Sequence, residues 1–178
     1  MKSEEQIRDE AIYSVAQKMM IAARTAPKGR GSDHMVIHVV GKEIIEKIAL
    51  QMKELVQKEN WPHSFERDAG NILQASWMVI LGTKIEPMRL KICGMCGYKN
   101  CDEKDKNPEV PCVFNTGDLG IAIGSAVSVA MDNRVDNRIM YTVGQVVKRM
   151  KLLPEEVKII YGIPLSVSSK NPFFDRLR

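Results

Sequence analysis

The chain has 178 residues, of which 44% are hydrophobic and 27% charged, and its formal net charge is +4. These values are typical of a soluble domain and argue against a disordered or membrane-embedded chain. A modest charge with 6% aromatic residues also argues against a nucleic-acid binder, which concentrates basic and aromatic side chains on one surface. The polar N-terminus lacks the apolar run of a signal peptide, so we expect a cytoplasmic protein.

The N-terminal third predicts two amphipathic helices around one strand. Ser3 and Gln6 form a capping-box pattern that begins a helix reaching about Ala23. The β-branched run over 35–40 predicts a buried strand. A second helix is expected over 42–58, where isoleucine, leucine, methionine and valine recur on one face.

The rest of the chain continues this alternation. The expected elements are a short helix capped by Ser64, a strand over 76–81, a helix over 117–131 capped by Asn115 or Thr116, a helix over 142–150, and a strand over 157–161 ended by Gly162 and Pro164. No repeat or low-complexity stretch divides the chain. We therefore expect one α/β or α+β domain over 1–178, with a cysteine-rich insert over 91–113.

The four cysteines carry the strongest chemical signal, with the spacing Cys93-x2-Cys96-x4-Cys101-x10-Cys112. Disulfides are disfavoured because cytosolic thiols stay reduced. Four thiolates would satisfy a zinc ion, but structural zinc sites usually contain two Cys-x2-Cys pairs and this chain has one. An iron–sulfur cluster fits the ligand number and spacing best, and zinc remains the alternative.

The residues between the cysteines also suit a cluster. Gly94 and Gly97 allow the backbone to pass close to inorganic sulfur and to direct amide groups at it. Four lysines flank the ligands, and near an anionic cluster they would raise its potential and offer docking charge; as ordinary loop residues they would only be solvated. These are Lys91, Lys99, Lys104 and Lys106.

Two resemblances extend this interpretation. The segment Cys-Gly-Met-Cys-Gly-Tyr-Lys-Asn-Cys over 93–101 resembles the small four-iron domain of corrinoid iron–sulfur proteins and electron-transport subunits, which implies a [4Fe–4S] cluster. The Ala-Arg-Thr-Ala-Pro run over 23–27, the strand after it, and the Tyr-Gly-Ile-Pro turn over 161–164 are similar to the nitroreductase family. The two together look like the group described as ferredoxin-domain-containing proteins.

The nitroreductase resemblance implies an α+β fold, with a mixed sheet flanked by helices, and a two-fold dimer that binds flavin mononucleotide at its interface. The family's N-terminal Arg-Arg-Ser-x-Arg phosphate clamp has no counterpart before Ser3. Lys28 and Arg30 could supply the phosphate charge instead, and Arg176 matches the basic residue at the family's closing end. Lys28 and Arg30 can equally be ordinary surface charges of a loop.

Small residues form a stripe on the helix expected over 117–131. Gly117, Gly120 and Gly124, continued by Ser128, permit close approach of another helix, as across a dimer axis, or of a flat ligand ring. No nucleophile-and-base pair can be identified, so the catalytic residues stay unknown.

We therefore expect an iron–sulfur redox protein that transfers electrons to a redox partner or reduces a small acceptor, with flavin as a further cofactor. The alternatives are a zinc-stabilised scaffold without redox activity and a flavin-only reductase.

Overall fold

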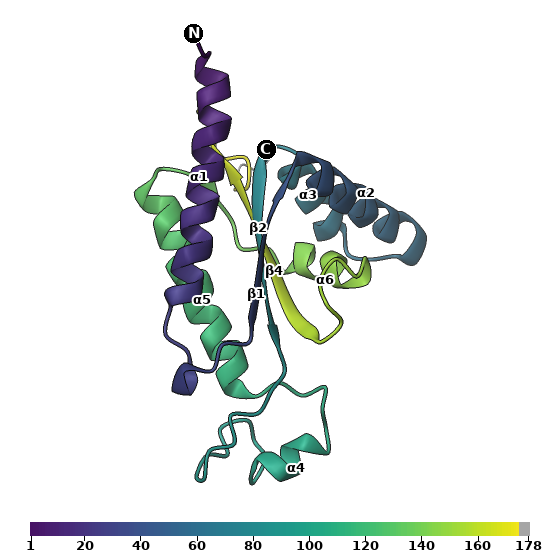
Figure 1. Cartoon of the computed structure of the whole chain (residues 1–178). Coiled ribbons are helices and arrows are strands. Elements are labelled where there is room, and N and C mark those ends of the chain that lie inside the picture. Colours follow the sequence, from purple (N-terminus) through teal and green to yellow (C-terminus); the bar gives the residue numbers. More distant parts are fainter. Residues whose placement is uncertain (175–178) are drawn as a thin grey trace.

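The computed structural model describes residues 1–174, which form a four-stranded sheet with helices on both faces (Figure 1). The strand order is β1-β2-β4-β3 and every described pair is antiparallel. The strands are β1 (Met35–Gly41), β2 (Trp77–Lys84), β3 (Asp136–Asn137) and β4 (Val157–Ser166). The predicted α+β class is confirmed, and the sheet is antiparallel rather than mixed.

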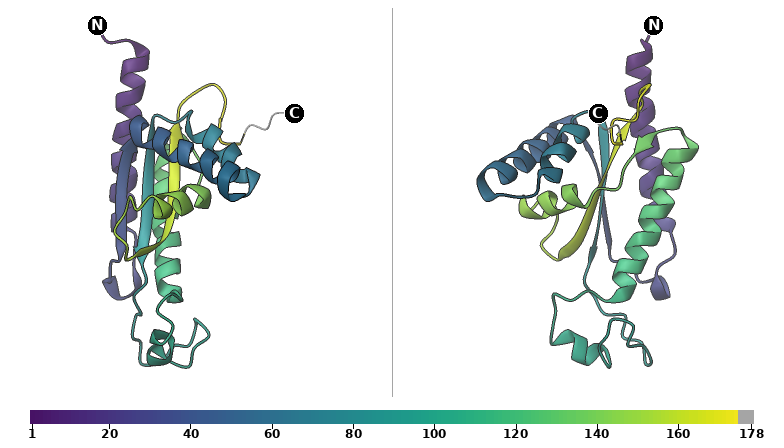
Figure 2. Two further views of the ribbon diagram at one scale, coloured as in Figure 1. Left: turned by 90° about the vertical axis from the view of Figure 1, so that its right-hand side faces the viewer. Right: turned by 180° about the vertical axis from the view of Figure 1, so that it is seen from behind.

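The helices make two layers around the sheet. α1 (Glu4–Thr25) and α5 (Val113–Asp132) pack together on one face, and α2 (Lys42–Glu59), α3 (His63–Ile72) and α6 (Tyr141–Arg149) cover the other (Figure 2). The predicted capping box is present, since the Ser3 hydroxyl accepts the Gln6 amide and the Gln6 side chain accepts the Ser3 amide. The predicted first and second helices are therefore confirmed.

The two layers bury opposite faces of the same strands. Along β2, Met78 and Ile80 lie in the core under α2, α3 and α6, whereas Val79 and Leu81 lie in the core under α1 and α5. Neighbouring strand residues point to opposite faces, so a short apolar run fills both cores. Each fully buried large apolar side chain contributes about 1.5–3 kcal/mol.

The prediction that Asn115 or Thr116 caps the α5 helix is wrong. The helix begins at Val113 with Cys112 as its N-cap, and the Cys112 carbonyl already accepts the amides of Asn115 (3.0 Å) and Thr116 (3.5 Å). The backbone is therefore helical before either predicted cap.

The predicted cap of α3 is also misplaced. Pro62 is the N-cap, so Ser64 lies inside the first turn and makes no capping hydrogen bond. Proline fits this position because it has no backbone N–H, and the amides at the start of a helix have no intrahelical acceptor to lose.

The prediction that Gly162 and Pro164 end the last strand is wrong, because β4 continues to Ser166. The Gly162 amide donates to the Met140 carbonyl at 3.1 Å, on the side away from β2. Amides two residues apart in a strand face the same side, so the missing N–H of Pro164 also faces away from β2 and breaks no bond to it. Gly162 is required for close packing, because a Cβ there would lie 2.3 Å from Val143 Cγ1.

Residues 85–112, here called the cysteine lobe, leave the body between β2 and α5. The lobe contains a short helix, α4 (Cys101–Asp105), and extends beyond one end of the sheet, opposite the N-terminal half of α1 (Figure 1). None of the described helices and strands packs extensively against α4. The lobe is therefore an appendage of the body, anchored mainly at its two ends.

By its length and composition, helix α5 could cross a bilayer, and 39% of its most apolar window is buried in the described structure. It packs along α1 and against β2. Such a helix is also found in the cores of soluble proteins, so this property is weak evidence for a membrane span.

Candidate metal centre

All four cysteines lie in the lobe, and all four are free thiols. Cys93 is exposed, Cys96 and Cys101 are half-buried, and Cys112 is buried at the start of α5. Within residues 1–174 no three cysteine, histidine or acidic side chains are arranged so that they could hold a metal ion. The lobe gathers the predicted ligands in one appendage, but the structure does not bring them into one coordination sphere.

The turns beside the ligands are built on glycine. Gly94 and Gly97 have φ values of +96° and +89°, and the Gly97 amide donates to the Gly94 carbonyl at 2.9 Å. Only glycine adopts this left-handed backbone without strain. The chain therefore turns sharply between Cys93 and Cys96, as expected where a backbone wraps closely around a compact group.

The helix α4 is held by local polar contacts. The Asn100 side chain accepts the Glu103 amide at 2.9 Å, and the Glu103 carboxylate accepts the Lys99 amide at 2.7 Å. Arg89 bonds Asp105 at 2.5 Å, and this hydrogen bond raises the pKa of the Arg89 guanidinium above its ordinary value. The fixed positive charge of Arg89 thus ties the start of the lobe to α4.

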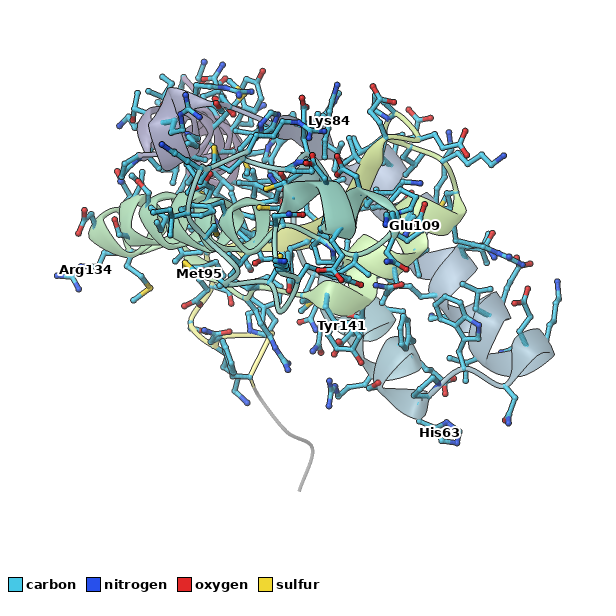
Figure 3. The ribbon with its side chains drawn as sticks, turned by 90° about the horizontal axis from the view of Figure 1, so that it is seen from below. His63, Lys84, Met95, Glu109, Arg134 and Tyr141 are labelled. Atoms are coloured by element: carbon cyan, nitrogen blue, oxygen red, sulfur yellow. The ribbon has the colours of Figure 1, made fainter. Side chains whose placement is uncertain are left out.

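Two further contacts join the lobe to the body. The Glu86 amide donates to the Asn115 side-chain oxygen at 2.9 Å, which fixes the start of the lobe to α5. Lys158 of β4 lies 3.6 Å from the carboxylate of Glu109 near the other end. Figure 3, which looks onto this end of the molecule, labels Glu109 and the exposed Met95 at different sides of the lobe.

The donor chemistry fits an iron–sulfur cluster in two respects beyond the four thiols. Lys104 is a cation with 2% of its surface exposed, inside a segment that would surround an anionic group. Asn115 is 1% exposed, and its side-chain Nδ2 has no hydrogen-bond acceptor among the described residues. Composition and spacing cannot reveal burial, so sequence reasoning did not distinguish these two residues from their neighbours.

Two of the three predicted flavin-phosphate residues, Lys28 and Arg30, lie near the same end of the molecule. The Lys28 ammonium donates to three carbonyls at the end of α1, those of Ala23 (2.8 Å), Arg24 (2.5 Å) and Ala26 (2.7 Å). Arg30 is exposed and lies 3.5 Å from the Met88 carbonyl, at the start of the lobe. Arg176 lies outside the described residues.

A cavity of about 500 Å³ lies at the other end of the sheet. Its lining includes Arg8 of α1, Gly41, Trp77 and Ser166. At a rise of 1.5 Å per residue, Arg8 lies about 25 Å along α1 from the C-terminal end of the helix, where the Lys28 ammonium is bound. Lys28 and Arg30 therefore do not line this cavity.

Solved structures define the class of fold. A nitroreductase with bound FMN from Desulfitobacterium hafniense aligns over 96% of this chain and 80% of its own, at a TM-score of 0.59 and 15% identity. A nitroreductase family protein from Clostridium novyi aligns over 91% and 76%, at a TM-score of 0.59 and 16% identity. The fold is nitroreductase-like.

Sequence comparison identifies the family. Residues 109–176 match the family model described as "Uncharacterized protein containing a ferredoxin domain (DUF2148)", a range that includes Cys112 and excludes the other three cysteines. A protein of Archaeoglobus fulgidus, named as an uncharacterized protein, is 36% identical over 181 residues, covering 98% of this chain and 96% of its own length. The chain belongs to this family of ferredoxin-domain-containing proteins.

Proposed function

We propose that this protein is an iron–sulfur redox protein in which Cys93, Cys96, Cys101 and Cys112 bind one [4Fe–4S] cluster. The observation that carries the proposal is the collection of four free thiols in one lobe of a ferredoxin-domain family member. When bound, such a cluster supplies one-electron transfer. The predicted insert over 91–113 is then a cluster-binding segment of a single nitroreductase-like domain.

The chain's own residues would position and tune the cluster. Gly94 and Gly97 supply the turns between ligands, and Cys112 is the N-cap of α5, where the positive end of the helix dipole favours an anionic ligand. Ile92 and Met95 are 88% and 68% exposed next to two of the ligands. This apolar tip would let a redox partner or small acceptor approach closely. The four free thiols suit a cytoplasmic location.

The lobe has the freedom to bring its sulfur atoms together. It is fixed to the body near Glu86 and Glu109, whereas Cys93 and Cys96 stand in turns made of exposed and half-buried residues. Rearrangement of such turns costs little, because few buried contacts have to break.

A flavin is proposed as a second cofactor, since the D. hafniense nitroreductase with this fold is described with bound FMN. Arg30 is the better placed of the two described phosphate candidates, because the Lys28 ammonium is already engaged by α1. We expect the wild-type protein to release yellow flavin on denaturation, and the Arg30→Met variant to release a smaller amount. A protein that contains no flavin after reconstitution would overturn this part of the proposal.

We also propose a homodimer that packs through α5. A Cβ built at Gly117, Gly120 or Gly124 meets no atom within 4 Å, and Ile121 beside them is 49% exposed. A long apolar helix with an open glycine face is suited to close contact with its symmetry mate. The stripe predicted from sequence is therefore left uncovered by this chain's own elements in the described structure.

The cluster is tested by anaerobic reconstitution followed by metal, sulfide and absorbance measurements. We expect about four irons per chain and a broad absorbance near ~400 nm that bleaches with dithionite. Cys93→Ser, Cys96→Ser, Cys101→Ser and Cys112→Ser should each lower the iron content. Met95→Ser is the matched control, because it changes an exposed non-ligand residue between two ligands. One zinc per chain with no response to dithionite, or a colourless metal-free protein, would overturn the proposal.

A further inference from the structure

The cysteine lobe carries the two most exposed large apolar side chains of the described structure after Met1. Ile92 is 88% exposed and Met95 is 68% exposed, and the other large apolar side chains, Met1 apart, are at most 62% exposed. The two residues stand on either side of Gly94, three positions apart, so their Cα atoms lie within about 11 Å of each other. A scattered apolar residue is normal on a surface, but a pair on a projecting lobe suits contact with another molecule (Figure 1).

Positive charge accompanies these apolar side chains. Residues 90–99, here called the lobe tip, contain Lys91 and Lys99 and no acidic residue. Both lysines are exposed, and their ammonium groups have no ion pair or hydrogen bond among the described residues. The acidic residues of the lobe all lie outside the tip, and they are Glu86, Asp102, Glu103, Asp105 and Glu109.

These acidic residues already have partners within the chain. The Arg89 guanidinium lies 3.5 Å from the carboxylate of Asp102 and 2.5 Å from that of Asp105. The remaining partners, at 2.7, 3.6 and 3.3 Å, are the Lys99 amide for Glu103, Lys158 for Glu109 and His34 for Glu86. The exposed charge of the lobe that has no partner in the chain is therefore positive, and it includes both lysines of the tip.

We propose that the lobe tip is a docking surface for an acidic redox protein, one whose own surface carries an apolar patch rimmed by aspartate or glutamate carboxylates. This inference rests on the proposed function, because two of the proposed cluster ligands belong to the tip. Protein interfaces bury an apolar centre and keep charged groups at the rim, which is the arrangement that Ile92 and Met95 make with Lys91 and Lys99.

The two parts of the tip have different roles in docking. The apolar pair holds the complex together, because burial of apolar surface does not depend on salt screening. The exposed lysines steer the encounter with a negatively charged surface, and salt weakens this effect. Binding to a lipid surface usually needs the apolar face of an entire amphipathic helix, whereas the tip offers two apolar side chains, so a protein is the favoured partner.

The test uses two small acceptor proteins of opposite charge, acidic rubredoxin and basic cytochrome c. Reconstituted protein is reduced with dithionite and desalted, and its iron content is measured first. On mixing, the reduced cluster loses one electron and the acceptor's Fe(III) becomes Fe(II), so no other reactant is needed. Stopped-flow absorbance gives the second-order rate constant. Between about 20 and 500 mM salt, this constant should fall about tenfold or more with rubredoxin and should not fall with cytochrome c.

Two double variants separate the charged and apolar parts of the tip. Lys91→Gln with Lys99→Gln should lower the rubredoxin rate constant about tenfold at low salt and leave it unchanged at high salt, because only steering is lost. Ile92→Ser with Met95→Ser should lower it at both salt concentrations, because apolar contact is not screened. Cytochrome c is the internal control, since a change in the cluster itself would alter the rate with both acceptors.

The matched charge control is Lys42→Gln with Lys148→Gln. Both lysines are exposed and lie outside the lobe, at the start of α2 and in α6. This variant loses the same two charges from the chain as the tip variant does. It should therefore keep at least most of the wild-type rate with rubredoxin, because steering depends on where charge lies as well as on net charge.

The outcomes separate this inference from the function beneath it. A wild-type protein that binds no iron overturns the proposed function, and calorimetric titration of that protein with rubredoxin then tests the tip alone: binding weakened by the tip variants supports it, and no binding overturns it. Iron-loaded protein whose rubredoxin rate is the same in the wild type and both tip variants overturns the docking surface only. Co-sedimentation with phosphatidylserine vesicles that Ile92→Ser with Met95→Ser abolishes, beside such equal rates, would assign the tip to a lipid surface instead.

Discussion

The carboxylate of Asp118 accepts the backbone amide of Gly29 through both oxygens, at 3.0 and 3.1 Å, across 89 residues of sequence. Asp118 lies in the second turn of α5 and is only 6% exposed. A Cβ at Gly29 would come within 2.9 Å of Met88 and 3.0 Å of Phe114. The loop after α1 is thereby fixed against α5 beside the start of the cysteine lobe.

Asp118→Ala should therefore destabilise the protein by about 1–3 kcal/mol, because it removes a charged acceptor and leaves the Gly29 amide without its partner. Urea unfolding followed by circular dichroism measures the change. Asp132→Asn, an exposed change at the end of the same helix, is the control and should stay within about 0.5 kcal/mol of wild type. Equal stability of the two variants would show that this hydrogen bond does not hold the loop.

The same loop predicts a pH dependence through Asp33. Burial alone would raise the pKa of the Asp33 carboxyl, but the hydrogen bond from Arg24, the amide of Met35 and the charges of Arg24 and Lys28 outweigh it and lower this pKa. A group whose pKa is lower in the folded state stabilises the fold above its unfolded pKa, near ~3.9. This contribution is lost as pH falls through the lower, folded value.

We therefore expect Asp33→Asn to be less stable than wild type at pH 7, by no more than about 1 kcal/mol because Asp33 is partly exposed. The difference should shrink as pH falls below the unfolded pKa, near ~3.9, and should disappear below the lower, folded pKa, where the carboxyl is protonated in both states. Thermal unfolding of both proteins from pH 7 down to pH 3 measures it. A difference that stays constant over this range would contradict the assignment.

The sequence predicts the regular elements well where a pattern repeats. Ser3 with Gln6, and the apolar face of the second helix, depend on neighbours in sequence and were confirmed. The errors at Asn115 and Gly162 arose where long-range contacts decide, because the end of β4 depends on which side of the strand faces β2. The antiparallel arrangement of the sheet is likewise a matter of tertiary pairing.

In the candidate site, too, the features that depend on local sequence were predictable and those that depend on the tertiary fold were not. Cysteine spacing is local, so it predicts the ligand set, which stays a prediction because the described thiols are not gathered around one centre. The burial of Lys104 depends on how the lobe folds over α4, and four similar lysines in a loop give no sign of it. The hydrogen bonds from Lys28 to the end of α1 could not be predicted from sequence either, since a loop lysine after a proline is typical of a surface charge.

The proposed dimer makes a separate prediction about Gly120. A Cβ at this position meets nothing within 4 Å in the single chain, so Gly120→Glu should not disturb the fold and should favour the helix by about 0.5–1 kcal/mol. At a close helix–helix interface the same glutamate would clash and bury a charge. We expect a folded monomer, measured by sedimentation velocity.

Gly70→Glu is the matched control for this experiment. Gly70 is an exposed glycine of α3 whose Cβ position is also open, but it lies on the other face of the sheet from α5. Its variant should keep the oligomeric state of the wild type. A Gly120→Glu protein with that same state would place the dimer contact elsewhere.

The packing of α6 on β4 gives the sharpest stability prediction. A Cβ at Gly144 would lie 1.7 Å from the Ile160 carbonyl oxygen and 2.4 Å from its carbon, which are backbone atoms held in the sheet. Because a strand bonded to β2 cannot yield like a side-chain tip, Gly144→Ala should destabilise the protein by about 3 kcal/mol, at the upper end for overpacked cores. Gly70→Ala should instead be neutral or stabilise by about 0.5–1 kcal/mol. Urea unfolding of both variants measures the contrast, and wild-type stability in Gly144→Ala would mean that α6 does not contact β4 at this point.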